Sequence, residues 1–587
     1  MTAVKNKPKK RKKLSQEELN QRRIKREHSK LIKNAFRAVG FTPVPSAADK
    51  EFTYDGATSD FDDVFVYENI IVLVEYTISQ ESDVSKHIKN KKIVYDKIVG
   101  THVDFLTFFF GKFPEVEKAS GNKYTKHQIR VVICYCSLNT VKSETKSLVP
   151  NVKYLDYNVA RYFDVLTKTV KLSARFEIFD FLGLEGKDVA SGVLTSSDGT
   201  RKFPGSILPE SHSNFGEGFK VVSFYMDPAA ILERAYVLRK YGWKDGGSVY
   251  QRMIVKTKIA SVRKYLKDQR RVFINNIIVT LPNDTKLLNK EGDTINPKDI
   301  QETQPGTIQI PSRFNTIGII DGQHRVFSYH EGGLYEEDIA KLRVQQNLLI
   351  TGIVFPKSMS DEDRLKFEAT LFLEINSTQT NARSDLKQEI NLVINPYSAD
   401  SIAKRVANYL NDNHGPLRDE FERFFFEKGK LKTTSVVSFA LRPLVSPNSR
   451  SSLYRTWNDP DKSAVTKGTD PAKLAEYVKY CASEINRLFS AVKANLPSDR
   501  WTADRKQPKR FLGTANVNGV LGALRRVAGA GHLETFDVYK TRLAGIAEFP
   551  FDDFKSSQYN RMGAKIYSTH LAPKESIASD GEALVEA

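Results

Sequence analysis

Two groups of polar residues stand at the ends of apolar, strand-like runs and could carry chemistry. In the first group, within SDFDDVFVYENIIVLVEYTIS, Asp62 and Asp63 precede one apolar run and Glu75 ends the next. Two adjacent strands would bring these carboxylates to one end of a sheet, and paired carboxylates of this kind typically hold Mg²⁺ in phosphodiester-cleaving sites. We therefore predict a metal site of Asp62, Asp63 and Glu75, with Asp63 and Glu75 as the catalytic pair that shares one ion.

The second group lies on a turn, in IIDGQHRVFSYHEGG. Gly322 allows a sharp bend and a close approach of a ligand to the backbone, and the amides that begin the following helix favour an anion. Arg325 can fork onto phosphate oxygens, and Asp321 can hold a metal or a ribose hydroxyl. His324 or Gln323 can orient or deprotonate a water, which makes His324 a catalytic candidate. The turn predicts a nucleotide phosphate site; the alternative is a structural turn with an exposed histidine.

The charge balance of the chain favours a polyanionic partner. The 587 residues carry a formal net charge of +19, which indicates nucleic acid or, less often, an anionic membrane surface. Residues 1–30 contain twelve lysines or arginines and three glutamates, and residues 1–14 cannot form a core. We expect a disordered basic arm that contacts the phosphates of double-stranded DNA, with a solubilising tail as the alternative. The candidate phosphate contacts are Lys9, Lys10, Arg11, Lys12 and Lys13 in the arm, and Lys89, Lys91 and Lys92 farther along the chain.

Length and composition predict a multidomain protein of the cytoplasm. The chain is too long for one hydrophobic core, so several domains are expected. Three cysteines indicate a reducing compartment rather than a disulfide scaffold. No apolar run reaches the roughly 20 residues of a membrane span, so no membrane partner is expected. The basic start MTAVKNKPKKRKK has no apolar segment after it, unlike a secretory signal.

The elements around the first group follow a regular order. A helical stripe covers residues 15–39, and two strands follow with a turn at Glu68 and Asn69. SKHIKNKKIVYDKIVG predicts a basic helix, HQIRVVICYC a strand, and residues 152–183 an amphipathic helical segment. This order resembles the PD-(D/E)XK nuclease fold over residues 15–185.

The resemblance implies Mg²⁺-dependent DNA cleavage, with Asp63 and Glu75 as the catalytic carboxylates. The third catalytic position, however, holds Thr77 where the family has a lysine that stabilises charge at the phosphate. Lysines of the following helix that could supply this charge instead are Lys86, Lys89 and Lys91. Three interpretations remain open: an active nuclease, a nuclease fold retained only for binding, and an unrelated α/β sheet.

A second domain is expected over residues 200–400, after a linker or domain edge rich in Gly, Ser and Pro at 187–217. VYQRMIVKTKIASVRKYLKD predicts an amphipathic helix, FINNIIVTLPND and LLITGIVFP predict strands, and DEDRLKFEATLFLEINSTQ begins a helix that breaks near Asn376. DGQHR at 321–325, followed by FLEINSTQ at 372–379, resembles the DGQHR-domain family, whose DndB-like members have a fold similar to ParB and sulfiredoxin.

That second resemblance implies a nucleotide site coupled to DNA binding. It indicates binding of ATP or another NTP, with slow hydrolysis, in a bacterial DNA-modification or phage-defence system. The matching nucleotide-binding residues are Asp321, Gly322, Gln323, His324 and Arg325 in the turn, and Asn376 and Gln379 in the later block.

The rest of the chain completes the expected architecture. Residues 401–570 predict helices, and residues 571–587 a disordered tail. We thus expect a multidomain α/β (α+β) protein with a PD-(D/E)XK-like mixed sheet, a ParB/sulfiredoxin-like DGQHR domain and an all-helical C-terminal region. The expected function is that of a DndB-like, DNA-binding and NTP-binding protein. The alternatives are a Mg²⁺-dependent restriction nuclease gated by the DGQHR domain, and a non-catalytic scaffold or regulator that contacts other proteins of its operon.

Overall fold

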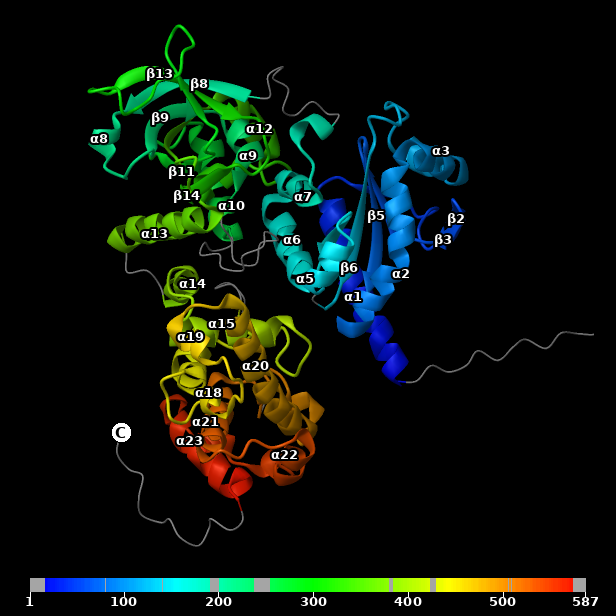
Figure 1. The fold of residues 1–587 in the computed structure, drawn as a ribbon, viewed down its shortest axis with the longest axis vertical. Coiled ribbons are helices and arrows are strands. Elements are labelled where there is room, and N and C mark those ends of the chain that lie inside the picture. Colours follow the sequence, from blue (N-terminus) through cyan, green and yellow to red (C-terminus); the bar gives the residue numbers. More distant parts are fainter. Residues whose placement is uncertain are drawn as a thin grey trace, which may run out of the picture.

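Three regions follow one another along the chain (Figure 1). The first is a mixed sheet between helices, the second is a larger mixed sheet with helices, and the third is helical. The expected multidomain α/β class is therefore confirmed. The computed structural model describes residues 16–79, 81–139, 141–189, 200–236, 254–379, 384–422, 429–504, 506–507 and 509–573.

The first region is built on a five-stranded sheet in the order β1-β4-β5-β6-β7. β4 runs antiparallel to β1 and β5, whereas β5, β6 and β7 run parallel. Its strands are β1 (Thr42–Pro43), β4 (Asp63–Tyr67), β5 (Ile70–Thr77), β6 (Arg130–Ser137) and β7 (Val152–Leu155), with a separate hairpin of β2 (Phe52–Tyr54) and β3 (Ala57–Ser59). Its helices include α1 (Gln16–Ala38), α2 (Glu81–Gly100), α3 (His102–Lys112), α4 (Pro114–Ala119), α5 (Ser143–Leu148), α6 (Tyr157–Val170) and α7 (Arg175–Leu182).

β5 is the central strand, and its sequence explains its place. All residues of Ile70–Thr77 are buried, as expected of a strand that is covered on both faces. Because side chains alternate along a strand, Val72 and Val74 pack with residues of α1 and α6, while Ile71 and Leu73 pack with residues of α2 and α3. This alternation decides which charged side chains meet at the end of the strand.

Most elements expected in this region are confirmed: the two strands around Glu68, the basic helix and the strand that follows it. The helical segment expected from residue 152 is wrong at its start, because Val152–Leu155 pairs in parallel with β6 as an edge strand. The helix begins only after Asp156, whose side chain accepts hydrogen bonds from two amides of its first turn.

The second region contains an eight-stranded sheet in the order β10-β14-β11-β15-β9-β8-β13-β12. α13 packs on one face of the sheet, where its Phe372 shares an apolar cluster with Ile320 of β14. On the other face, α9, α10 and α12 contribute to the apolar core. The strands are β8 (Thr200–Leu208), β9 (Lys220–Met226), β10 (Ala235–Tyr236), β11 (Ile277–Leu281), β12 (Lys286–Leu288), β13 (Gln304–Pro311), β14 (Ile317–Asp321) and β15 (Leu348–Val354). The helices are α8 (Glu210–Ser213), α9 (Pro228–Arg234), α10 (Lys256–Gln269), α11 (Gln323–Phe327), α12 (Glu336–Gln345) and α13 (Asp361–Gln379).

Two expectations for this region are corrected. Residues 187–217, expected as a linker or domain edge, are not a continuous linker, because Thr200–Leu208 forms β8, which pairs with β13 and β9. Glycine misled the interpretation there: a Cβ at Gly205 would lie 2.3 Å from the carbonyl oxygen of Ser223, so the residue is needed where strands pack closely. The helix break near Asn376 is also misplaced, because the backbone of α13 stays helical to Gln379.

The first two regions share one apolar core. Phe314, in the loop before β14, packs its ring against Phe176 and Phe179 of α7. The side-chain amide of Asn315 donates to Asp180 at 3.1 Å. The two sheets are therefore joined by buried side chains and not only by the covalent chain.

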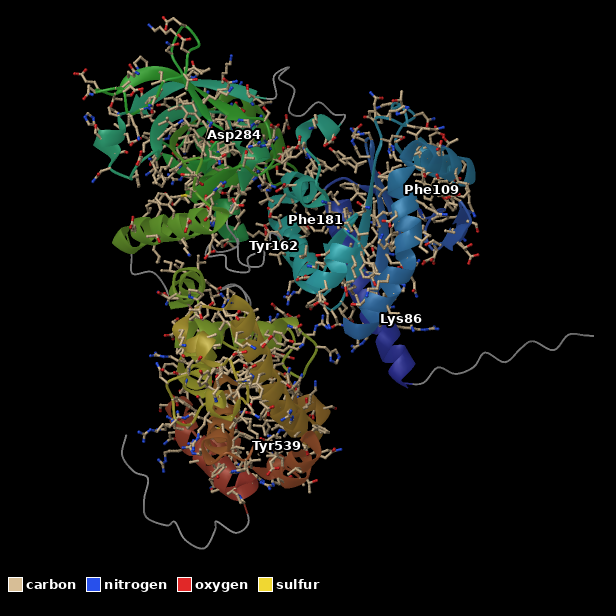
Figure 2. The ribbon with its side chains drawn as sticks, in the orientation of Figure 1. Lys86, Phe109, Tyr162, Phe181, Asp284 and Tyr539 are labelled. Atoms are coloured by element: carbon tan, nitrogen blue, oxygen red, sulfur yellow. The ribbon has the colours of Figure 1, made fainter. Side chains whose placement is uncertain are left out.

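From α15 onward the C-terminal region has its own core, which includes the buried Tyr539 labelled in Figure 2. Ile390 and Val393 of α14 pack with the second region instead. A loop of the C-terminal region touches the first region: Arg418 lies over the ring of Tyr157 at 4.1 Å, and Asp419 pairs with Arg161. Within the described residues, no helix is both long and apolar enough to cross a membrane. The main helices are α14 (Ser384–Ile394), α15 (Ala399–Asp412), α16 (Thr433–Val436), α17 (Arg442–Val445), α18 (Leu453–Thr456), α19 (Ser463–Lys467), α20 (Pro471–Ala494), α21 (Thr514–Ala530), α22 (Phe536–Arg542) and α23 (Tyr559–Ile566).

Candidate active site at the end of strand β5

The predicted pair of Asp63 and Glu75 is not formed. Asp63 lies opposite Val74 in the β4–β5 register and pairs with Lys33 of α1 at 2.9 Å. Glu75 is the next residue along β5 and points to the other face, where it pairs with Lys91 of α2. The prediction is wrong because adjacent positions of a strand point to opposite faces of its sheet. Asp63 is therefore removed from the metal and catalytic residues.

Asp62 remains beside Glu75. Its Oδ2 accepts a hydrogen bond of 2.6 Å from the backbone amide of Tyr76, at the end of β5. Its Oδ1 pairs with Lys25 of α1 at 3.0 Å. The negative charge of Asp62 also contributes to the raised pKa of Glu75. The two carboxylates thus interact at the same end of the sheet.

Lys91 supplies a cation that the strand itself lacks. Thr77 is buried and its hydroxyl donates to Ser79, so it brings no charge. Lys91 reaches in from α2: its Nζ lies 3.1 Å from Glu75 Oε2 and 2.9 Å from Asp60 Oδ1. The side chain of Lys91 is only 17% exposed, which makes it part of the site and not a free surface contact.

The other predicted lysines of α2 lie outside this cluster. Lys86 and Lys89 are exposed, and Figure 2 labels Lys86 on α2. Lys92 forms an ion pair with Asp96 one turn along the same helix. Lys86 and Lys89 are consequently available to a polyanion, whereas Lys92 is partly neutralised.

Burial sets the electrostatics of Glu75. Desolvation raises its pKa to about 7, while the neighbouring Lys91 lowers it and Asp62 raises it further. His87 Nε2 lies 3.7 Å from Glu75 Oε1, and His87 Nδ1 is 2.8 Å from the hydroxyl of Tyr135. Burial lowers the pKa of His87, which favours its neutral form. A carboxylate with a pKa near neutrality, flanked by a cation and an imidazole, is typical of functional sites.

The residues present could hold Mg²⁺ jointly. Mg²⁺ is usually held by one or two carboxylates together with waters and substrate phosphates, and Asp62 and Glu75 offer such a pair. No group of three or more His, Cys, Asp or Glu that could hold a metal ion occurs among the described residues. A divalent ion here would therefore depend on the substrate for part of its coordination.

The DGQHR turn has the expected backbone. Asp321 ends β14, and Gly322 has a φ of +95°, which residues other than glycine rarely adopt. A Cβ at Gly322 would lie 2.6 Å from the side chain of Ile277. The following helix, α11, has only five residues, so its contribution to anion binding is small.

The side chains of the turn are largely bound by near neighbours. Arg325 Nη2 pairs with Asp321 Oδ2 at 2.8 Å, so its guanidinium is not a free phosphate fork. His324 Nε2 accepts a hydrogen bond of 3.2 Å from the amide of Val255. Gln323 Oε1 is buried and has no hydrogen-bond partner in the described chain. The turn brings these four side chains together, as predicted, but Arg325 and His324 already have partners in the protein.

Several predicted residues fall outside what is described. The arm residues Lys9 to Lys13 precede the described chain. Asn376 and Gln379 lie on α13, but their side chains are outside the described residues. Their predicted roles in DNA and nucleotide binding stay predictions.

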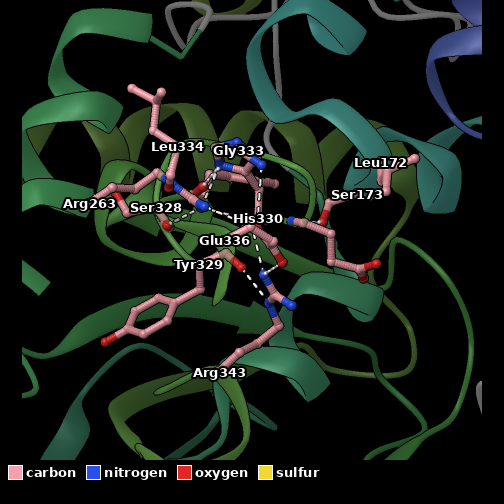
Figure 3. Close-up of polar contacts among 12 residues, drawn as sticks. Leu172, Ser173, Arg263, Ser328, Tyr329, His330, Gly333, Leu334, Glu336 and Arg343 are labelled. Atoms are coloured by element: carbon pink, nitrogen blue, oxygen red, sulfur yellow. Dashed lines mark hydrogen bonds and ion pairs between the residues drawn. The ribbon is translucent and has the colours of Figure 1, made fainter. Parts of the chain in front are cut away.

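A buried arginine network just after the turn was missed by sequence reasoning (Figure 3). Arg263 of α10, 1% exposed, donates to the carbonyl oxygens of Ser328, His330 and Leu334 and pairs with Glu336. Arg343 of α12 donates to the carbonyl oxygens of Tyr329 and His330 and pairs with the same Glu336. Burial and the charge of Arg263 lower the pKa of His330 to about 4. The only signal in the sequence is an arginine at a core position of an amphipathic helix.

Comparisons with protein-family models, curated proteins and solved structures find no match.

Proposed function

We propose that the protein hydrolyses phosphodiester bonds of double-stranded DNA in a Mg²⁺-dependent reaction at Asp62, Glu75 and Lys91. One observation carries the proposal: Lys91 Nζ lies 3.1 Å from Glu75 Oε2, although the lysine position of the PD-(D/E)XK pattern holds Thr77. The order of α1, the antiparallel strands β4 and β5, the crossover helix α2 and the parallel strand β6 supports it as well. This order of elements agrees with the PD-(D/E)XK nuclease fold, which the sequence resembles.

Each side chain has a role that its surroundings suit. Asp62 and Glu75 would hold Mg²⁺, which supplies Lewis acidity and a bound water of lowered pKa. Lys91 carries a permanent charge beside the carboxylates and can stabilise the negative charge that develops on the phosphate. His87, fixed by Tyr135, can accept a proton as a neutral imidazole.

The surface around the site suits a polyanion. Lys25 of α1 reaches Asp62, and Arg22 and Arg26 are exposed within one turn of Lys25 on the same helix. Lys86 and Lys89 add exposed cations on α2. Cations on two helices that flank the site can position a phosphate backbone without reading its sequence.

Cleavage of plasmid DNA tests the proposal directly. The wild type should nick or cut DNA, modified or unmodified, with Mg²⁺ and should not do so with EDTA. The Glu75→Gln variant should bind DNA normally and fail to cleave it. Absence of cleavage by the wild type on every DNA tested would refute the proposal.

A second candidate function rests on the DGQHR turn. It is that of a DndB-like protein that binds NTP in a DNA-modification or phage-defence system. The acceptor Gln323 Oε1, buried and without a hydrogen-bond partner in the described chain, suits a nucleobase or a water rather than a phosphate oxygen. For phosphate to bind, Arg325 would have to exchange Asp321 for it.

A further inference from the structure

Helix α10 carries exposed cations along its length. The buried side chains of Lys256–Gln269 are Ile259, Arg263 and Leu266. Asp268 is the one acidic residue between 256 and 271, and it pairs with Lys264 at 2.5 Å. The exposed basic residues of this stretch are Lys256, Lys258, Lys264, Lys267, Arg270 and Arg271.

Three of the four lysines in this set are not neutralised by carboxylates. Within the part of the chain that the structure describes, Lys256, Lys258 and Lys267 form no ion pair with Asp or Glu. Lys267 lies instead 4.7 Å from the centre of the Tyr335 ring, on the exposed surface. Arg270, by contrast, is 3.7 Å from Asp338. Free cations spaced along a helix complement the regular charges of a nucleic-acid backbone.

The helix is held rigidly from its buried side (Figure 3). Arg263 forms bonds of 2.6 to 3.0 Å to the loop that follows the DGQHR helix and to Glu336. At the start of the helix, the amide of Val255 donates to His324. A helix fixed at both places presents its cations with little loss of conformational entropy on binding.

We propose that the exposed face of α10 is a second DNA-binding surface, which contacts the phosphates of double-stranded DNA outside the candidate active site. The proposal rests on the proposed function for the choice of duplex DNA as ligand. It requires no cleavage, because the cations of α10 contact phosphates and take no part in the chemistry. It also connects DNA binding to the DGQHR turn through Arg263 and His324.

Binding of a labelled DNA duplex to the full-length protein in EDTA tests this surface. One variant carries Lys256→Gln, Lys258→Gln and Lys267→Gln. The control carries Lys467→Gln, Lys479→Gln and Lys540→Gln, three exposed lysines of the C-terminal region. Each lost phosphate contact lowers the slope of log K against log salt by about 0.9. The magnitude of this slope should be smaller by about 2 to 3 for the α10 variant than for the wild type, and the control should match the wild type.

Each outcome decides the proposal. An α10 variant with the wild-type slope overturns it, and so does an equal loss in the control, which would mean that only net charge matters. A wild type that does not bind duplex DNA overturns it as well. Because the assay contains no divalent ion, a shallower slope for the α10 variant supports the surface even if the wild type proves unable to cleave DNA.

Discussion

The two candidate sites satisfy their polar side chains in different ways. At the end of β5, Glu75 meets Lys91 and His87 from α2, and Asp62 from the loop before β4. These groups come from separate elements, and burial raises the pKa of Glu75 to about 7. Bringing charged groups together in a buried place costs desolvation energy.

At the DGQHR turn, in contrast, the ion pair forms within the turn itself. Arg325 pairs with Asp321 four residues earlier, and His324 accepts from the amide of Val255. Such bonds stabilise the turn whether or not a ligand binds. The DGQHR turn is the more conspicuous motif in the sequence, but the buried charged groups from separate elements gather around Glu75. Such an arrangement costs desolvation energy and is better explained by function than by folding.

The largest expected effect separates Lys91 from its neighbours on α2. Lys91→Ala should lower Mg²⁺-dependent DNA cleavage by roughly 100- to 1,000-fold, the usual cost of losing a group that stabilises transition-state charge. Lys89→Ala is the matched control, since Lys89 is exposed on the same helix, and should stay near the wild-type rate. Equal rates for the two variants would remove Lys91 from the chemistry.

The next effect concerns stability around the DGQHR turn. Arg263→Ala should lower the free energy of unfolding by about 3 to 5 kcal/mol, because it leaves the carbonyl groups of Ser328 and Leu334 without this donor and removes one of the two arginines that pair with Glu336. Chemical denaturation monitored by circular dichroism measures this loss. Arg271→Ala, at an exposed position after the same helix, should change stability by less than about 0.5 kcal/mol. A small loss for both variants would contradict a structural role for the network.

A third experiment asks whether the turn also binds nucleotide. Arg325→Ala should weaken NTP binding by roughly 10- to 150-fold, the cost of one charge-assisted bond of about 1.5 to 3 kcal/mol. Calorimetry with ATP, GTP and CTP in the presence of Mg²⁺ measures it, with Arg313→Ala, about half exposed, as the control. If the wild type binds none of the three nucleotides, the turn is structural, and only the site at the end of β5 remains a functional candidate.

The smallest effect is a pH dependence set by Glu75. Its pKa is raised from 4.5 to about 7 in the folded protein, so folding favours the protonated form. The wild type should therefore lose stability relative to Glu75→Gln as pH rises from about 4.5 through about 7, with no further change above that range. Thermal unfolding in EDTA at several pH values measures the difference. A constant difference between the two proteins over that range would show that the carboxyl group has an ordinary pKa.

Local pattern predicted the elements better than their contacts. The strands around Glu68, the basic helix α2 and the strand-turn-helix at Gly322 follow from alternation, helical spacing and glycine chemistry. β8 was missed, because Gly205 serves strand packing there and not a flexible linker. Position along the chain could not show which of Asp62 and Asp63 shares a face with Glu75, since this depends on the strand register.

The site itself could be predicted only in part. Glu75 and a lysine from α2 were candidates from the sequence, but the choice of Lys91 over Lys86 and Lys89 required the helix orientation. The part played by His87 depends on its contact with Tyr135, which lies on a strand 48 residues away. Contacts of this kind are set by tertiary packing, which no local spacing records.

The apolar core that joins the first two regions has a thermodynamic consequence. Phe314 inserts between rings of α7, so cutting the chain between the two sheets would expose apolar surface on both halves. The two sheets should therefore melt together as one cooperative unit, and neither should be a stable fragment alone. The C-terminal region from α15 onward, with a separate core, should melt in a transition of its own. Calorimetry of the whole chain would then show two transitions for three regions.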